Sequence, residues 1–113
     1  MSVSSHVLDT ATGRPAAGVR VTLEAREPDG GWTAVGEGVT DANGRLQALV
    51  LGDHGSRGGV HRLRFDTGGW FAARGLGGFY PEVTVVFEVA DPADHYHLPL
   101  LLSPYGYTTY RGS

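Results

Sequence analysis

Cysteine is absent from this 113-residue sequence, so disulfide bridges, thiolate nucleophiles and cysteine-based metal sites are excluded. A chain without cysteine fits a reducing compartment. The opening residues, MSVSSHVLDT, also have neither the basic region nor the apolar region of a secretory signal peptide. We therefore expect a cytoplasmic protein.

Long apolar runs and a surplus of basic residues are also missing. No run approaches the roughly 20 apolar residues that a transmembrane helix needs. Nine basic residues, all of them arginine, face twelve acidic residues and give a net charge of −3. Nucleic-acid-binding domains usually carry an excess of positive charge. We expect neither a membrane nor a nucleic-acid partner, and the length fits one domain over residues 1–113.

Glycine, in contrast, is abundant: 18 residues stand singly or in pairs between short apolar runs. Glycine in such positions is typical of turns. Several of the runs alternate between apolar and polar side chains, most clearly VRVTLEARE, and this alternation predicts half-buried strands. We expect strands at residues 2–9, 19–27, 32–40, 45–51, 60–66, 79–91, 95–103 and 105–113.

The turns and the one helical segment complete the expected fold. The pairs Asp29-Gly30 and Asn43-Gly44 favour hairpin turns, and Ser103-Pro104 is expected to turn the last hairpin. Residues 10–18 predict a turn-rich connection and residues 52–59 a loop, while WFAARGLGG at 70–78 has helical character. Many short strands with regular turns predict an all-β antiparallel sandwich or barrel.

The segment HYHLPLLLS places two histidines on one face of a strand. Residues i and i+2 of a strand point to the same side, so His95 and His97 share a face. The opposite face is apolar and is expected to meet the core: Tyr96, Leu98, Leu100 and Leu102. The final strand carries aromatic residues on both faces, which indicates an oligomer interface. An edge hairpin with ordinary surface histidines would fit the same spacing.

A zinc site is a further reading of these histidines. His95 and His97, with His6 from the first strand, could supply three imidazole ligands and leave one coordination position open. No acidic partner for the histidines is evident in the sequence, so we expect no metal.

Three segments together resemble one known family. SSHVLDTATGRPAAGV, DANGR and HYHLPLLLSPYGYTTYRGS are similar to the 5-hydroxyisourate hydrolases, the transthyretin-related enzymes of purine breakdown. The resemblance covers essentially the whole chain in the same order. The terminal YRGS is specific, because transthyretin proper, a hormone carrier, lacks it.

The resemblance implies a fold, an assembly and a reaction. The fold would be a transthyretin-like antiparallel β-sandwich of two four-stranded sheets with one short helix. Four copies would form a homotetramer with the active sites in a channel between dimers. The reaction would be the hydrolysis of 5-hydroxyisourate to 2-oxo-4-hydroxy-4-carboxy-5-ureidoimidazoline in urate degradation. The family uses no cofactor and no metal.

The resemblance also implies the site residues: a catalytic set of His6, Arg45, His97 and Ser113, and a substrate-binding set of Tyr110, Arg111 and Gly112. Hydrolysis of a lactam needs a base for the attacking water and positive charge near the developing oxyanion. Either of the histidines His6 and His97 could be the base while the other orients or donates. Arg45 would bind substrate or oxyanion, and Arg111 would fix the C-terminal segment or contact substrate.

Two other functions remain open. A carrier related to transthyretin could use a central channel lined by Tyr105, Tyr107 and Tyr110 for an aromatic ligand. The second is a structural sandwich of the adhesion type. Such domains usually present variable loops, whereas the unusual residues here cluster on strands. The remaining histidines are expected to be ordinary residues: His54 in a loop, His61 on a strand and His95 on the face next to His97. At the position of His61 the family commonly has an aromatic residue.

Overall fold

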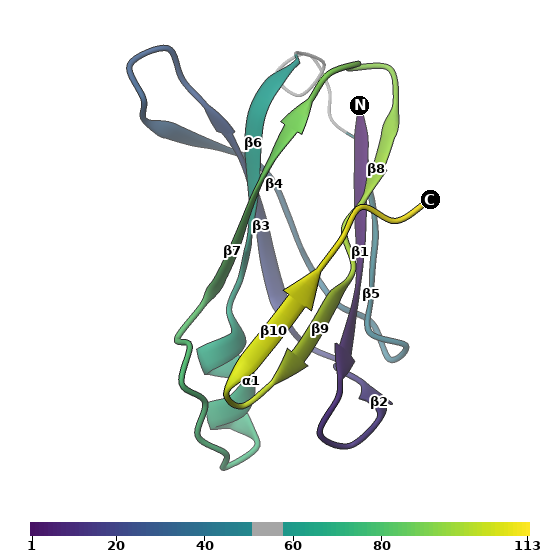
Figure 1. The fold of residues 1–113 in the computed structure, drawn as a ribbon, viewed down its shortest axis with the longest axis vertical. Coiled ribbons are helices and arrows are strands. Elements are labelled where there is room, and N and C mark those ends of the chain that lie inside the picture. Colours follow the sequence, from purple (N-terminus) through teal and green to yellow (C-terminus); the bar gives the residue numbers. More distant parts are fainter. Residues whose placement is uncertain (51–57) are drawn as a thin grey trace.

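The computed structural model describes residues 1–50 and 58–113 (Figure 1). Two sheets face each other in these residues, and one short helix closes one end. The elements are β1 (Ser2–Asp9), β2 (Arg14–Pro15), β3 (Arg20–Arg26), β4 (Trp32–Val39), β5 (Arg45–Val50), β6 (Gly59–Phe65), α1 (Thr67–Ala73), β7 (Val83–Val89), β8 (His95–His97), β9 (Leu100–Ser103) and β10 (Gly106–Thr109).

Strand β1 is the centre of the first sheet. On one side it pairs with β8 and then β9, and β10 pairs with β9; on the other side it pairs with β5 and then β2. This sheet has six strands but is four strands wide, because β8 and β9 follow each other on one side of β1 and β5 and β2 on the other. Its width is that of the expected four-stranded sheet. The pairing of β1 with β8 and β9 is parallel, which corrects the expectation of a purely antiparallel fold. These strands come from opposite ends of the chain, so no hairpin forces them to run antiparallel.

The second sheet has the order β4-β3-β6-β7 and is antiparallel throughout. Alternate residues of both sheets point inward and form one core, as the period-two pattern predicted. Burial of each large apolar side chain contributes about 1.5–3 kcal/mol. The most deeply buried are Val3, Val7, Val19, Val21, Leu23, Leu63, Phe65, Val83, Val89, Leu100 and Leu102.

The expected strand over 95–103 is interrupted at Leu98 and Pro99, which separate β8 from β9. Proline has no N–H to donate to a sheet ladder, so it ends the pairing there. The backbone stays against β1, because Leu98 N donates to Ser4 O at 3.0 Å and Ser5 Oγ donates to Leu98 O at 2.6 Å. The core-facing row of Tyr96 and the three leucines is confirmed.

The helix begins and ends earlier than expected: it spans Thr67–Ala73, not 70–78. Asp66 caps it by accepting a hydrogen bond from Gly69 N at 3.0 Å. Gly75, with φ of 68°, provides the left-handed residue just beyond the C-terminal end. Gly68 and Gly69 stand in the first turn, and because glycine disfavours helix, the sequence did not predict this start. Trp70 and Phe71 are buried and fasten the helix to the core.

The turn at Asn43-Gly44 is not a hairpin, because β4 belongs to the second sheet and β5 to the first. It is instead a corner between the sheets. The Ser103-Pro104 hairpin is confirmed, since β9 and β10 pair antiparallel across it. Arg14 and Pro15 form a short strand inside the expected connection. The other expected strands are recovered with small shifts at their ends, except that β7 begins only at Val83 and β10 already ends at Thr109 instead of 113.

Residues 51–57, which include His54 and most of the expected loop, lie outside the described residues. Within the described part of the chain, no helix has the length and apolar character needed to cross a membrane.

Candidate functional site

The candidate site lies on the outer face of the first sheet, around the middle of β1. Alternate β1 residues are buried, so the side chains between them point away from the core. Those side chains are polar near the start of the strand: Ser2, Ser4 and His6. Strand β5 on one side and β8 on the other supply the neighbours of this polar row.

His6 and Arg45 are directly opposite each other in the antiparallel pairing of β1 and β5, so their side chains share the outer face. His6 Nε2 lies 2.9 Å from Asn43 O. A carbonyl oxygen only accepts, so Nε2 carries the proton and Nδ1 is left as the acceptor of the neutral ring. The corner turn therefore orients both His6 and Arg45.

Asp41 holds that turn together. Its Oδ1 accepts from Asn43 N at 2.9 Å and from Arg45 N at 3.0 Å, and its Oδ2 accepts from Gln47 Nε2 at 3.1 Å. The hydrogen bonds from the Arg45 amide and then the Asn43 amide lower the pKa of Asp41, and burial opposes them. The contact with Gln47 and the positive charge of Arg45 lower this pKa further. Gly44, with φ of 75°, lets the turn approach β1 so that Val7 N donates to Gly44 O at 2.7 Å.

His97 sits on the other side of β1, where Ser4 is its partner in the parallel pairing. Ser4 Oγ is 2.8 Å from His97 Nδ1 and 2.9 Å from His95 Nε2, so one hydroxyl joins two imidazoles. Ser2 Oγ contacts the remaining His95 nitrogen, Nδ1, at 2.5 Å. His97 is partly buried, whereas His95 is exposed.

The surroundings of His97 favour its neutral form. Burial lowers the pKa of its imidazole, and the positive charge of Arg45 and the neighbouring His95 and His6 lower that pKa further. The backbone of Ser4 opposes these effects only weakly. A neutral imidazole at neutral pH can accept a proton, which a general base must do.

Gly112 crosses over His97. The two residues form an antiparallel bridge, with Gly112 N donating to His97 O at 2.7 Å. A Cβ atom at Gly112 would come within 2.6 Å of His97 Cδ2, so only glycine fits without moving the imidazole. The C-terminal tail thus runs beside β8 at His97. Figure 1 shows the tail crossing the first sheet there.

The other tail residues lie differently. Since Gly112 faces the same side as His97, Arg111 points to the opposite side of the sheet. Its side chain is exposed, and its guanidinium lies 4.9 Å from the ring centroid of the buried Tyr96. This position fits the first expected role of Arg111, fixing the C-terminal segment. Tyr110 and Ser113 are exposed.

A hollow of about 250 Å³ opens on this face. Arg45 and His97 line it from opposite sides of β1; the other lining residues are Ser4, Ser5, Leu46, Gln47 and His95. His6 lies beside it, as the register opposite Arg45 requires. In the described residues, His6, His95 and His97 do not form a group able to hold a metal ion. Ser4, Asp41 and Gln47 were missed from the sequence, although Ser4 stands two residues before His6 on the same strand face.

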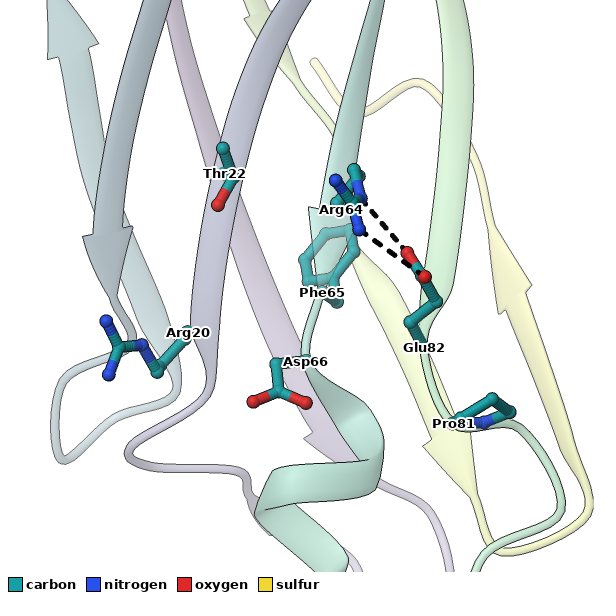
Figure 2. Close-up of a pocket in the computed structure, with 7 residues that line it drawn as sticks. All are labelled: Arg20, Thr22, Arg64, Phe65, Asp66, Pro81 and Glu82. Carbon is teal, nitrogen blue, oxygen red and sulfur yellow. Dashed lines mark hydrogen bonds and ion pairs between the residues drawn. The ribbon is translucent and has the colours of Figure 1, made fainter. Parts of the chain in front are cut away.

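A second hollow, of about 280 Å³, lies on the outer face of the second sheet (Figure 2). Arg64 and Glu82 point toward each other in it, with Arg64 Nε 3.0 Å from Glu82 Oε2. Arg20 and Asp66 also line it, and no histidine is among its described lining residues. It therefore lacks the imidazole that makes the first hollow a candidate for acid–base chemistry.

The tyrosines of the last hairpin do not share one face. Tyr107 is opposite the buried Leu102, so it belongs to the core-facing side of β10, and its ring packs edge-on against Tyr80 with centroids 5.2 Å apart. Tyr105 is 80% exposed at the turn. A channel wall made jointly of Tyr105, Tyr107 and Tyr110 is therefore not formed on the histidine face.

Comparison with known proteins places these residues in a family. Residues 3–112 match the model of the HIUase/Transthyretin family. A 5-hydroxyisourate hydrolase of Salmonella dublin is 47% identical over 98% of this chain and 80% of its own length.

Two solved structures resemble the fold. A 5-hydroxyisourate hydrolase of Klebsiella pneumoniae has a TM-score of 0.84 at 36% identity, covering 100% of both chains. Sea bream transthyretin in complex with thyroxine has a TM-score of 0.87 at 37% identity, covering 97% of this chain and 93% of its own. The fold alone thus does not separate enzyme from carrier. The chain belongs to the HIUase/Transthyretin family.

Proposed function

We propose that this protein is a hydrolase that converts 5-hydroxyisourate to 2-oxo-4-hydroxy-4-carboxy-5-ureidoimidazoline in urate degradation. The observation that carries the proposal is the meeting of a neutral imidazole, His97, and a guanidinium, Arg45, across one hollow. Relatives of 41–47% identity that are named 5-hydroxyisourate hydrolases support the same substrate.

The chemistry follows from these two groups. His97 takes a proton from a water molecule as its oxygen attacks the lactam carbonyl carbon of the substrate. Arg45 stabilises the negative charge that develops on the carbonyl oxygen, and its planar fork suits the oxygen and nitrogen edges of a purine derivative. The C–N bond then breaks, the ring nitrogen receives a proton, and a carboxylate forms. No metal or cofactor takes part in this scheme.

The remaining expected residues are assigned by their positions. His6 is the second imidazole, held by Asn43 O and directly opposite Arg45, where it orients substrate or donates a proton. Gly112 makes room for the His97 ring, and Arg111 anchors the tail on Tyr96. Tyr110 and Ser113, exposed in a single copy, contact substrate in the assembled protein.

Assembly as a homotetramer is part of the proposal. The polar outer face of the first sheet is open in one chain, and a second copy placed over it would enclose the substrate and exclude water. Light scattering after size-exclusion chromatography gives the mass directly; a monomer that retains full activity would contradict this part. The cytoplasm is proposed as the compartment, supported by the absence of cysteine.

The test is acceleration of substrate decay. Urate and urate oxidase generate 5-hydroxyisourate in the cuvette, and its ultraviolet absorbance is followed with and without the protein. Since the compound decays spontaneously, the expected result is a faster decay that is proportional to protein concentration and insensitive to chelator. A decay rate equal to the spontaneous one would refute the function. Loss of activity on chelation would instead restore the zinc hypothesis.

A carrier function is the second candidate, because the thyroxine complex of sea bream transthyretin has so similar a fold. A carrier has no chemical need for a neutral imidazole beside a guanidinium. Calorimetric titration with thyroxine separates the two: saturable binding without any acceleration of 5-hydroxyisourate decay would favour the carrier.

A further inference from the structure

We propose that Ser4 is a positioning residue that fixes the tautomer of His97 and connects this imidazole to His95. Its catalytic consequence rests on the proposed function, whereas the tautomer itself can be measured without any substrate. The hydroxyl stands between the two rings, 2.8 Å from His97 Nδ1 and 2.9 Å from His95 Nε2.

The position of Ser4 is imposed by the backbone. Ser4 and His97 are partners in the parallel pairing of β1 and β8, and Leu98 N donates to Ser4 O at 3.0 Å. The side chains of Ser4, His95 and His97 therefore face the same side of the sheet at neighbouring positions. Ser2 extends the row, because its Oγ is 2.5 Å from His95 Nδ1. The result is a continuous chain of hydrogen bonds from His97 through Ser4 and His95 to Ser2.

A hydroxyl has one proton, which allows two directions for this chain. In the first, His97 Nδ1–H donates to Ser4, Ser4 donates to His95 Nε2, and His95 Nδ1–H donates to Ser2. The unprotonated nitrogen of His97 is then Nε2. In the second direction every bond is reversed, and His97 Nε2 carries the proton.

Arg45 selects the first direction. Its guanidinium lines the same hollow as His97 and carries a permanent positive charge. A lone pair on His97 Nε2 is attracted to that charge, whereas an N–H dipole there is repelled. Among the described residues His97 Nε2 makes no hydrogen bond, so it is open to a water molecule. Ser4 thus holds His97 with its basic nitrogen available.

The chain also gives the abstracted proton a path. When His97 Nε2 accepts a proton from water, its Nδ1 proton moves to Ser4 Oγ as the original hydroxyl proton of Ser4 moves to His95 Nε2. One proton enters at His97 and one arrives at His95, and Ser4 remains a neutral hydroxyl. The positive charge thereby moves from His97, whose neighbours include Arg45 and His6, to the ring of His95, which is exposed to solvent.

The primary test is ¹⁵N NMR of the histidine rings in the free protein. We expect His97 in the Nδ1–H form at neutral pH, and the same form in Ser4→Thr, which keeps the hydroxyl. In Ser4→Ala the Nδ1 proton of His97 loses the oxygen that accepts it, so the charge of Arg45 alone should leave a mixture of tautomers. The matched control is Ser103→Ala, which removes a hydroxyl from the same sheet that donates to Gly106 O and contacts no histidine. An Nε2–H form in the unaltered protein, or an unchanged tautomer in Ser4→Ala, would overturn the proposal.

The second test is kinetic. Ser4→Ala should lower kcat about tenfold with less than about twofold change in KM, in the range of a lost positioning contact. Ser4→Thr should recover most of the rate, and Ser103→Ala should match the unaltered protein. Equal kcat in Ser4→Ala and the unaltered protein would reject the catalytic role. If the unaltered protein shows no hydrolysis at all, the proposed function fails, but the NMR result still decides whether Ser4 sets the tautomer.

Discussion

The outer faces of the two sheets both carry arginine, yet the neighbours of these arginines differ. On the second sheet, Arg62 Nε lies 2.7 Å from Glu24 Oε1, and Arg64 is bonded to Glu82 (Figure 2). On the first sheet, Arg45 stands opposite His6 and across a hollow from His97. No ion pair reaches Arg45 in residues 1–50 and 58–113.

This difference separates a structural face from a reactive one. Where arginine meets glutamate, each charge satisfies the other, and the bond from Arg64 lowers the pKa of Glu82. Where arginine meets imidazole, the guanidinium keeps its charge available and disfavours protonation of the imidazole. A positive charge and a base can then coexist beside one bound molecule, which paired charges do not allow.

The largest effect on activity should come from removing the proposed base, His97, from the outer face of the first sheet. His97→Ala should lower kcat for 5-hydroxyisourate about 100-fold or more, because a positioned general base contributes about 10²–10⁴-fold. The coupled urate oxidase assay measures this loss, and a thermal melt checks that the variant is folded. Retention of more than about half the rate would assign the base to His6 instead.

Arginines on the two faces should respond unequally to the same substitution. Arg45→Ala should reduce kcat/KM about 100-fold, since it removes the charge that stabilises the oxyanion. Arg64→Ala is the matched control: its ion pairs are partly exposed, so we expect unchanged activity and a stability loss below about 1 kcal/mol. Chemical denaturation and the hydrolysis assay give both values. Similar activity losses in the two variants would remove the functional distinction between the faces.

A single methyl group at Gly112 tests how closely the His97 ring is positioned. In Gly112→Ala the new Cβ would lie 2.6 Å from His97 Cδ2, so the imidazole must shift and kcat should fall about tenfold. Gly106→Ala serves as the control from the same C-terminal region, because its Cβ would meet Ser103 Oγ at 3.6 Å, an ordinary contact. An active Gly112→Ala variant would mean that the tail does not fix the ring.

The smallest effect concerns pH. Because the pKa of His97 is lowered, its base form should persist below the ordinary histidine value of about 6.5. Between pH 7.5 and 6.5 the unprotonated fraction of an ordinary histidine falls about 1.8-fold, so the rate of this protein should fall by clearly less than that amount. A profile of kcat/KM against pH, in the presence of excess urate oxidase, measures this limb. A steeper loss over that interval would contradict the neutral imidazole.

The lowered pKa of His97 also makes the stability of the fold depend on pH. The unfolded chain protonates His97 near pH 6.5, whereas the folded chain does so at lower pH. The contribution of His97 to stability is therefore complete above that value and is lost as the pH falls through the folded-state pKa. Denaturant titrations over this range should show the decrease, and His97→Ala should show less of it.

Strand positions and strand faces could be read from the sequence because alternation is a local property. The shared outward face of His95 and His97 and the core row that begins with Tyr96 were both correct. The site residues and their expected roles came from the resemblance to a family, since alternation gives a face but not a neighbour. The meeting of His6 with Arg45 depends on a register between strands far apart in sequence.

Other features could not be predicted because they depend on tertiary contacts. The corner at Asn43-Gly44 has the sequence of a hairpin turn, and only the pairing of β5 with β1 makes it a connection between sheets. The parallel direction of β8 has no local signal either. Ser4 carries no sign of its role until His95 and His97 are placed beside it.

The parallel pairing of β1 with β8 and β9 has a consequence for biosynthesis. Residues 2–9 are synthesised long before their partners at 95–102. An incomplete chain therefore exposes a β1 edge that pairs readily with other strands, and such contacts of high sequence separation form slowly. The unpaired β1 edge is an aggregation risk until β8 and β9 have been made, and the catalytic groups of β1 and β8 meet only then.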